Sequence, residues 1–95
     1  MKTLRLTLKK KWFDMVFCGT KTEEYRTPSQ WIESRLLCKT YDAVEFKNGY
    51  GAGVPSVTVK YLGWHKGPGF EAWGAESGRE YYVIRLGEII ERKSP

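Results

Sequence analysis

Histidine and cysteine are scarce in this chain, and their scarcity limits the chemistry that it can carry. His65 is the only histidine among 95 residues, so we expect no histidine-based metal cluster. The two cysteines, Cys18 and Cys38, show neither a CxxC spacing nor the density of a disulfide scaffold. We therefore expect reduced thiols, no bound metal and no cofactor.

Long apolar runs are also missing. No segment approaches the roughly 20 apolar residues of a membrane-spanning helix. Residues 1–8 contain no apolar run of signal-peptide length. We expect a cytoplasmic monomer with no membrane partner.

The sequence nevertheless has enough apolar material for a core, because 41% of its residues are hydrophobic and 15% are aromatic. Its length predicts a single domain over residues 1–95. The formal net charge is +5. Five basic residues lie in the first eleven positions: Lys2, Arg5, Lys9, Lys10 and Lys11. This excess favours a polyanionic partner such as RNA, although a solvated basic surface explains it equally well.

Hydrophobic periodicity predicts two strands and two helices in the first half of the chain. Leucines at alternate positions predict a strand over residues 3–8. An apolar stripe over residues 12–17 predicts a short helix, which Gly19 ends in a left-handed conformation. Residues 21–26 alternate like a second strand. A capping box led by Thr27 predicts that a second helix begins there.

The second half of the chain predicts three strands joined by turns and one long loop. A strand within residues 41–51 ends in an Asn-Gly turn, and further strands cover residues 56–64 and 80–90. Residues 65–79 contain four glycines and a proline, which predict the longest loop. The order of elements favours an α+β fold, a small mixed, mostly antiparallel β-barrel flanked by two short helices.

The segment GTKTEEYR, residues 19–26, places one lysine, two glutamates and one arginine within eight positions. On a strand, Glu24 and Arg26 point to the same side about 7 Å apart. Lys21 lies at the helix-to-strand junction, close enough to join them. Opposite charges at such distances keep one another ionised. The trio could bind a polar ligand, or it could be an exposed ion-pair ladder that contributes at most about 1 kcal/mol per pair.

Gly19, Lys21, Glu24 and Arg26 fit the pattern G-x-K-x-x-E-x-R, which resembles the signature of the ASCH domain family. The flanking stretches KKWFDMVFCGTKTEEYR, NGYG and YYVIRLGEII also look like parts of that family, so the resemblance spans nearly the whole chain. It implies a β-barrel similar to the PUA domain of RNA-modifying proteins. It also implies a cleft that binds RNA or a modified nucleoside, with the motif as its floor.

One branch of that family hydrolyses the acetyl amide of N4-acetylcytidine with a lysine, a threonine and a glutamate. Lys21 matches the lysine, but Glu24 stands where the branch has its threonine. Glu71 or Glu76 in the long loop would have to supply the glutamate. Thr22 shares the strand face of Glu24 and could replace the hydroxyl nucleophile, displaced by about 7 Å.

Two functions therefore stay open. The first is an RNA- or nucleoside-binding domain in which Lys21, Glu24 and Arg26 clamp the ligand. The second is a small hydrolase of N4-acetylcytidine-type nucleosides or of single-stranded RNA. In that enzyme Lys21 and Glu24 would be the chemical pair, with Glu24 as the base and Lys21 stabilising the developing charge.

Aromatic and basic residues are expected around the cleft. Tyr50, on a turn flanked by glycines, and Trp73, in the long loop, could each stack a base with a gain of about 1–3 kcal/mol. Trp73 could equally plug one end of the barrel. Lys9, Lys10 and Lys11 precede the first helix, where they could bind phosphate or stay solvated.

Overall fold

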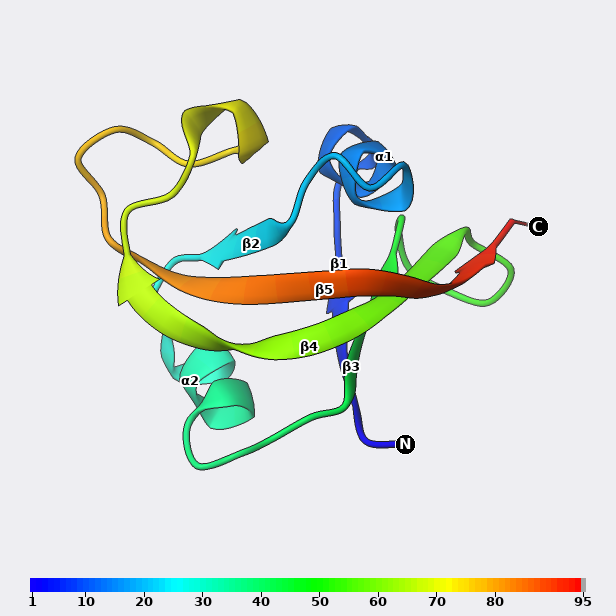
Figure 1. Cartoon of the computed structure of the whole chain (residues 1–95), viewed down its shortest axis with the longest axis horizontal. Coiled ribbons are helices and arrows are strands. Elements are labelled where there is room, and N and C mark those ends of the chain that lie inside the picture. Colours follow the sequence, from blue (N-terminus) through cyan, green and yellow to red (C-terminus); the bar gives the residue numbers. More distant parts are fainter. Residues whose placement is uncertain (95) are drawn as a thin grey trace.

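Five strands form one sheet in the order β1-β3-β4-β5-β2. A computed structural model describes residues 1–94 and shows this sheet as the frame of the protein (Figure 1). The strands are β1 (Thr3–Thr7), β2 (Glu23–Arg26), β3 (Ala43–Lys47), β4 (Ser56–Gly67) and β5 (Tyr81–Lys93). β1 is parallel to β3, and the other neighbours are antiparallel. The predicted mixed, mostly antiparallel α+β architecture is therefore confirmed.

The pairing of β4 with β5, the two longest strands, bends the sheet. Their register shifts three times between Thr58 and Trp64. Such irregularities increase the local right-handed twist, and the sheet curls into a half-barrel (Figure 1). The edge strands β1 and β2 are bridged across the opening, where Arg26 Nη2 donates a hydrogen bond to the Thr7 carbonyl at 3.0 Å.

Two helices, α1 (Lys10–Phe17) and α2 (Gln30–Leu36), lie at opposite ends of the half-barrel (Figure 1). Gly19 has a φ of +84°, which confirms the predicted left-handed residue after α1. The predicted capping box at Thr27 is wrong, because Ser29 caps α2 instead. Ser29 is extended, and its hydroxyl accepts the Ile32 N–H at 3.3 Å. Within residues 1–94, no helix has the length and apolar character to cross a membrane.

The inner face of the curl holds the hydrophobic core. Leu4 and Leu6 of β1 are buried while Arg5 between them is exposed, as the predicted alternation requires. Both helices add an apolar stripe to this core. Its main buried members are Leu4, Leu6, Leu8, Phe13, Val16, Ile32, Leu36, Val44, Phe46, Val57, Val59, Tyr82, Ile84 and Leu86. The core therefore draws on β1, β3, β4, β5 and both helices, whereas Tyr25 of β2 packs against a second, smaller cluster formed by Ala75, Tyr81 and Val83.

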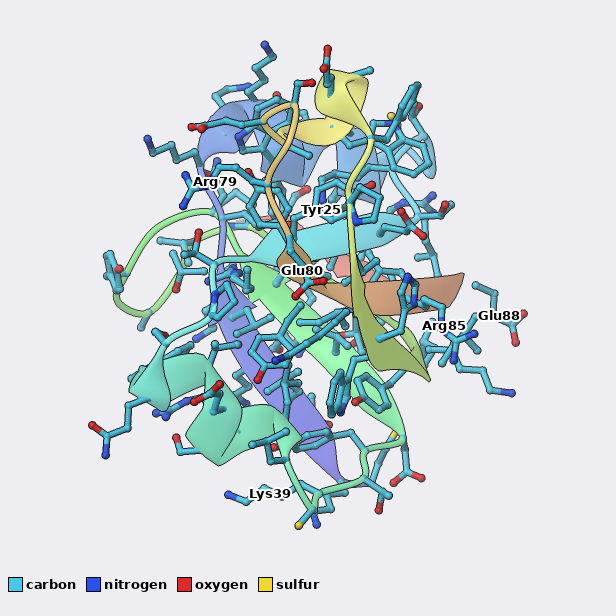
Figure 2. The ribbon with its side chains drawn as sticks, turned by 90° about the vertical axis from the view of Figure 1, so that its left-hand side faces the viewer. Tyr25, Lys39, Arg79, Glu80, Arg85 and Glu88 are labelled. Carbon is cyan, nitrogen blue, oxygen red and sulfur yellow. The ribbon has the colours of Figure 1, made fainter. Side chains whose placement is uncertain are left out.

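The loop between β4 and β5 is fastened to β2. It covers residues 68–80 rather than the predicted 65–79, because β4 continues to Gly67, and it contains the short 3-10 helix η1 (Glu71–Trp73). The Phe70 N–H donates to the Tyr25 hydroxyl at 2.9 Å. A Cβ at Gly69 would lie only 2.9 Å from Tyr25 Cδ1, so the glycine permits this close approach. Figure 2 shows Tyr25 between β2 and this loop.

Candidate functional site

The turn between α1 and β2 carries Lys21 into the interior. The backbone N–H groups of Thr20 and Lys21 both donate to the Met15 carbonyl, at 2.9 and 3.0 Å. Two bonds to one carbonyl fold the chain back on the end of the helix. As a result the Lys21 side chain enters the protein with 0% of its surface exposed.

Lys21, Glu24 and Arg26 form a continuous chain of ion pairs, as their spacing predicts. Lys21 Nζ donates to Glu24 Oε1 at 2.8 Å, and Arg26 Nε donates to Glu24 Oε2 at 2.7 Å. Only 7% of the Glu24 side chain is exposed. The trio is therefore not the exposed ion-pair ladder that the sequence left open.

The ammonium group of Lys21 is enclosed by the protein. It donates to Glu24 and to the backbone carbonyl of Glu23. Its Nζ lies 5.2 Å from the centroid of the Tyr25 ring, so an aromatic face covers it as well. Burial lowers the pKa of Lys21 below its usual range, and the Glu24 carboxylate opposes that shift. In this arrangement Lys21 positions Glu24.

Arg26 is more accessible, because 24% of its side chain is exposed. Of the five N–H donors of a guanidinium, one is used for Glu24 and one for the Thr7 carbonyl. No further hydrogen bond of this group is made within the described residues 1–94. The other donors of Arg26 therefore remain available for a ligand.

Glu24 and Arg26 line an open hollow between the end of β1, the start of α1 and β2. This β1–β2 hollow has a volume of about 480 Å³, within the range of about 300–1,000 Å³ that is typical of small-molecule sites. Its lining residues are Thr7, Leu8, Lys9, Trp12, Glu24, Tyr25, Arg26 and Thr27.

A second hollow lies beside the first, against the turn that follows β3. This β3-turn hollow has a volume of about 440 Å³ and is lined by Thr7, Leu8, Lys9, Asn48, Gly49 and Tyr50. The two hollows share the lining residues Thr7, Leu8 and Lys9 and are therefore adjacent, and we refer to the pair as the groove. Three of the predicted binding residues, Lys9, Arg26 and Tyr50, therefore line the same groove.

Lys10 and Lys11 have partners of their own and line neither hollow. Lys10 Nζ is 2.6 Å from Asp14 Oδ2, in a helical ion pair at the surface. Lys11 Nζ lies 4.8 Å from the Trp12 ring centroid. Lys9, by contrast, makes no salt bridge among residues 1–94, which leaves its ammonium available.

Thr22, Glu76 and Trp73, three further predicted site residues, also line neither hollow. Thr22 is exposed and precedes the first residue of β2. The Glu76 side chain is 71% exposed and pairs with Arg79 at 3.3 Å. Trp73 packs edge-on against Phe70, with ring centroids 5.0 Å apart. The structure thus separates these three residues from the hollow beside Glu24.

Sequence reasoning missed Trp12 as a wall of the groove. The apolar stripe of α1 places Trp12 against the core, and the half-buried ring does pack there, but it also lines the β1–β2 hollow. Gly74 of the β4–β5 loop covers one side of the ring, where a Cβ would lie 3.1 Å from Trp12 Cε2. A large aromatic residue in the first turn of a helix, next to three lysines, was the available signal.

Tyr25 couples the floor of the groove to the β4–β5 loop. Its hydroxyl donates to Glu23 Oε1 at 2.7 Å and accepts the Phe70 N–H at 2.9 Å. Burial and the hydrogen bond to Glu23 raise the pKa of Tyr25 to about 12. The ring therefore stays neutral near physiological pH and keeps both hydrogen bonds.

No metal-ligand cluster accompanies the groove: residues 1–94 contain no group of three or more His, Cys, Asp or Glu side chains placed to hold an ion. Comparison with known proteins gives no match, either to a family model, to a curated protein or to a solved structure. The resemblance to the ASCH family therefore stays a prediction.

Proposed function

We propose that the groove binds single-stranded RNA or a modified nucleoside, in an ASCH-like domain of PUA-like fold that acts in the cytoplasm. The Glu24–Arg26 pair carries this proposal. Lys21 holds the Glu24 carboxylate in place from the interior of the protein. The Thr7 carbonyl holds the Arg26 guanidinium in place. Unstacked bases expose edges that combine hydrogen-bond donors and acceptors, so a fixed acceptor beside a fixed donor suits them.

The charges in the groove favour a ligand that contains phosphate. Glu24 is neutralised from two sides, by Lys21 and by Arg26. Lys9 adds a further cation on the shared wall. Cations thus exceed carboxylates around the groove, in the same sense as the net charge of +5. Tyr50 supplies an open ring face on which a base can stack, and Trp12 adds aromatic surface to the wall of the β1–β2 hollow.

Binding is better supported than hydrolysis by the same geometry. A catalytic acid or base has to come within hydrogen-bond distance of the reacting group. The ammonium of Lys21 is enclosed and does not reach a substrate, whereas Glu24, whose two oxygens each accept one hydrogen bond, keeps lone pairs for a ligand. Thr22 lies outside the hollow. Hydrolysis of N4-acetylcytidine or RNA by Lys21 and Glu24 is therefore an alternative outcome of the test.

The binding test compares Arg26→Gln with Arg79→Gln. Arg79 is a matched control because it also pairs with a glutamate but lies outside both hollows. Fluorescence anisotropy with a labelled single-stranded RNA of random sequence should show a loss for Arg26→Gln of about 5- to 150-fold, equivalent to 1–3 kcal/mol. Arg79→Gln should bind like the wild type.

A second measurement separates binding from catalysis. The wild type and Lys21→Ala are incubated with N4-acetylcytidine and with the same RNA, and the products are read by mass spectrometry. Turnover by the wild type that disappears in a Lys21→Ala variant that is still folded would replace the binding proposal with the hydrolase. A folded wild type that neither binds nor turns over any of these ligands would contradict both.

A further inference from the structure

The two hollows meet on one short wall, formed by Thr7, Leu8 and Lys9 at the junction of β1 and α1. We propose that the groove holds two consecutive nucleotides of a single strand. One nucleotide occupies the β1–β2 hollow, the next occupies the β3-turn hollow, and Lys9 contacts the phosphate that joins them. This inference rests on the proposed RNA-binding function and adds the length of the ligand and its path across the groove.

Tyr50 marks the β3-turn hollow as a stacking position. Tyr50 is an unusually exposed aromatic residue, with 88% of its surface open to solvent. Within residues 1–94 its ring joins no aromatic pair and no cation–π contact. Gly49 and Gly51 flank it with φ angles of +107° and +94°. The fold therefore makes little use of the ring, and the flanking glycines leave room beside it for a base.

Lys9 is placed to serve the linking phosphate. It lines both hollows, so a group that passes from one to the other passes beside this residue. It is the N-cap residue of α1, whose first turn contains no acidic side chain. The positive end of the helix and the unpaired ammonium therefore act on the same place, where both favour an anion.

The two positions differ in what they can recognise. The β1–β2 hollow contains the Glu24 carboxylate and the free donors of Arg26, which can read the polar edge of a base. The β3-turn hollow has only Asn48 as a polar side chain beyond the shared wall, together with the Tyr50 ring. Stacking on an aromatic ring tolerates every base. The first nucleotide should therefore be selected by its identity and the second should not.

Calorimetric titrations with ligands of two lengths test this inference. The ligands are the four ribonucleoside 5′-monophosphates and the four 5′-phosphorylated homodinucleotides. We expect at least one dinucleotide to bind more tightly than its mononucleotide. Tyr50→Ala should weaken that dinucleotide by about 5- to 150-fold, the equivalent of 1–3 kcal/mol of stacking, and leave the mononucleotide unchanged.

Two control variants sharpen the result. Tyr50→Phe keeps the ring and should retain dinucleotide affinity. Trp31→Ala removes another exposed aromatic residue, 49% exposed on α2, and should leave binding unchanged. Mononucleotide binding without any gain from the second nucleotide would overturn the two-nucleotide inference and leave the proposed function standing. Absence of binding to both lengths and to longer RNA would overturn the proposed function itself.

Discussion

The two cations of the motif share one carboxylate but occupy different environments. Lys21 is fully enclosed, with 0% of its side chain exposed, whereas 24% of the Arg26 side chain is open to the groove. The Glu24 carboxylate therefore binds the enclosed Lys21 through one oxygen and the partly exposed Arg26 through the other. The difference indicates that the inner half of the motif stabilises the fold and the outer half is available to a ligand. Lys21→Met and Arg26→Gln test that division, and the other variants test the loop and the groove beside it.

The largest effect is expected for Lys21→Met. Removing the ammonium leaves Glu24 buried with only Arg26 to neutralise it, and losing one member of a buried ion pair costs about 3–5 kcal/mol. We predict a loss in unfolding free energy near the lower end of that range, measured by urea denaturation.

Lys10→Met is the matched control for that measurement. It breaks another lysine–carboxylate pair, with Asp14, but the Lys10 side chain is 77% exposed. An exposed helical pair contributes about 0.3–0.5 kcal/mol. Equal losses for the two variants would contradict the division between an enclosed and an open half.

Tyr25→Phe is expected to cost about 1–2 kcal/mol at neutral pH, because the hydroxyl bonds to Glu23 and to the Phe70 N–H are both lost. The pKa of Tyr25 is raised to about 12 in the folded protein. The Tyr25 hydroxyl therefore contributes fully to the free energy of unfolding below about pH 10, which is the pKa of tyrosine in the unfolded chain. This contribution is lost as the pH rises toward 12.

Denaturation of the wild type and Tyr25→Phe at several pH values checks this dependence. The stability difference between them should shrink between about pH 10 and 12, since lysine titration is common to both proteins. A difference that stays constant across that window would show that the Tyr25 hydroxyl does not hold the loop through its protonated form.

Arg26→Gln should lower stability by only about 1 kcal/mol, because its ion pair with Glu24 is partly exposed to solvent. The same variant should lose most of the affinity for RNA. A loss of stability as large as that of Lys21→Met, with RNA binding unchanged, would assign Arg26 to the fold and not to the ligand. Denaturation and anisotropy on one preparation give both quantities.

The smallest effects on stability are predicted for Lys9→Gln and Tyr50→Ala. Neither side chain is buried, and Lys9 makes no salt bridge within residues 1–94. Exposed substitutions of this kind usually change unfolding free energy by less than about 0.5 kcal/mol. Thermal melts of both variants should overlay that of the wild type, and a clear shift would mean that the groove is part of the packed structure.

Local pattern was sufficient to predict much of the fold. Alternating leucines located β1, Gly19 located the end of α1, and the strand period placed Glu24 and Arg26 on one side. The cap of α2 could not be settled locally, because Thr27 and Ser29 are both good capping residues and only the chain path selects Ser29.

The candidate site depended more on long-range geometry. The bridge from Arg26 to Thr7 joins residues 19 positions apart and exists because the bulges of β4 and β5 curl the sheet. The wall that Trp12 forms depends on the same curl. Burial of Lys21 follows from the turn at Met15, which periodicity does not reveal. The sequence could therefore propose the motif residues, but not which of them the fold would enclose.

The most direct test of the groove as an RNA-binding site is the salt dependence of RNA binding by Lys9→Gln and Lys39→Gln. Both replace an exposed lysine, but Figure 2 shows Lys39 at the lower end of the protein, opposite α1, the helix that follows Lys9. If Lys9 contacts phosphate in the groove, Lys9→Gln should bind RNA more weakly. The negative slope of log K against log salt should also become shallower by about 1. Lys39→Gln should match the wild type. Unchanged affinity and slope for Lys9→Gln would contradict the assignment of the groove to RNA.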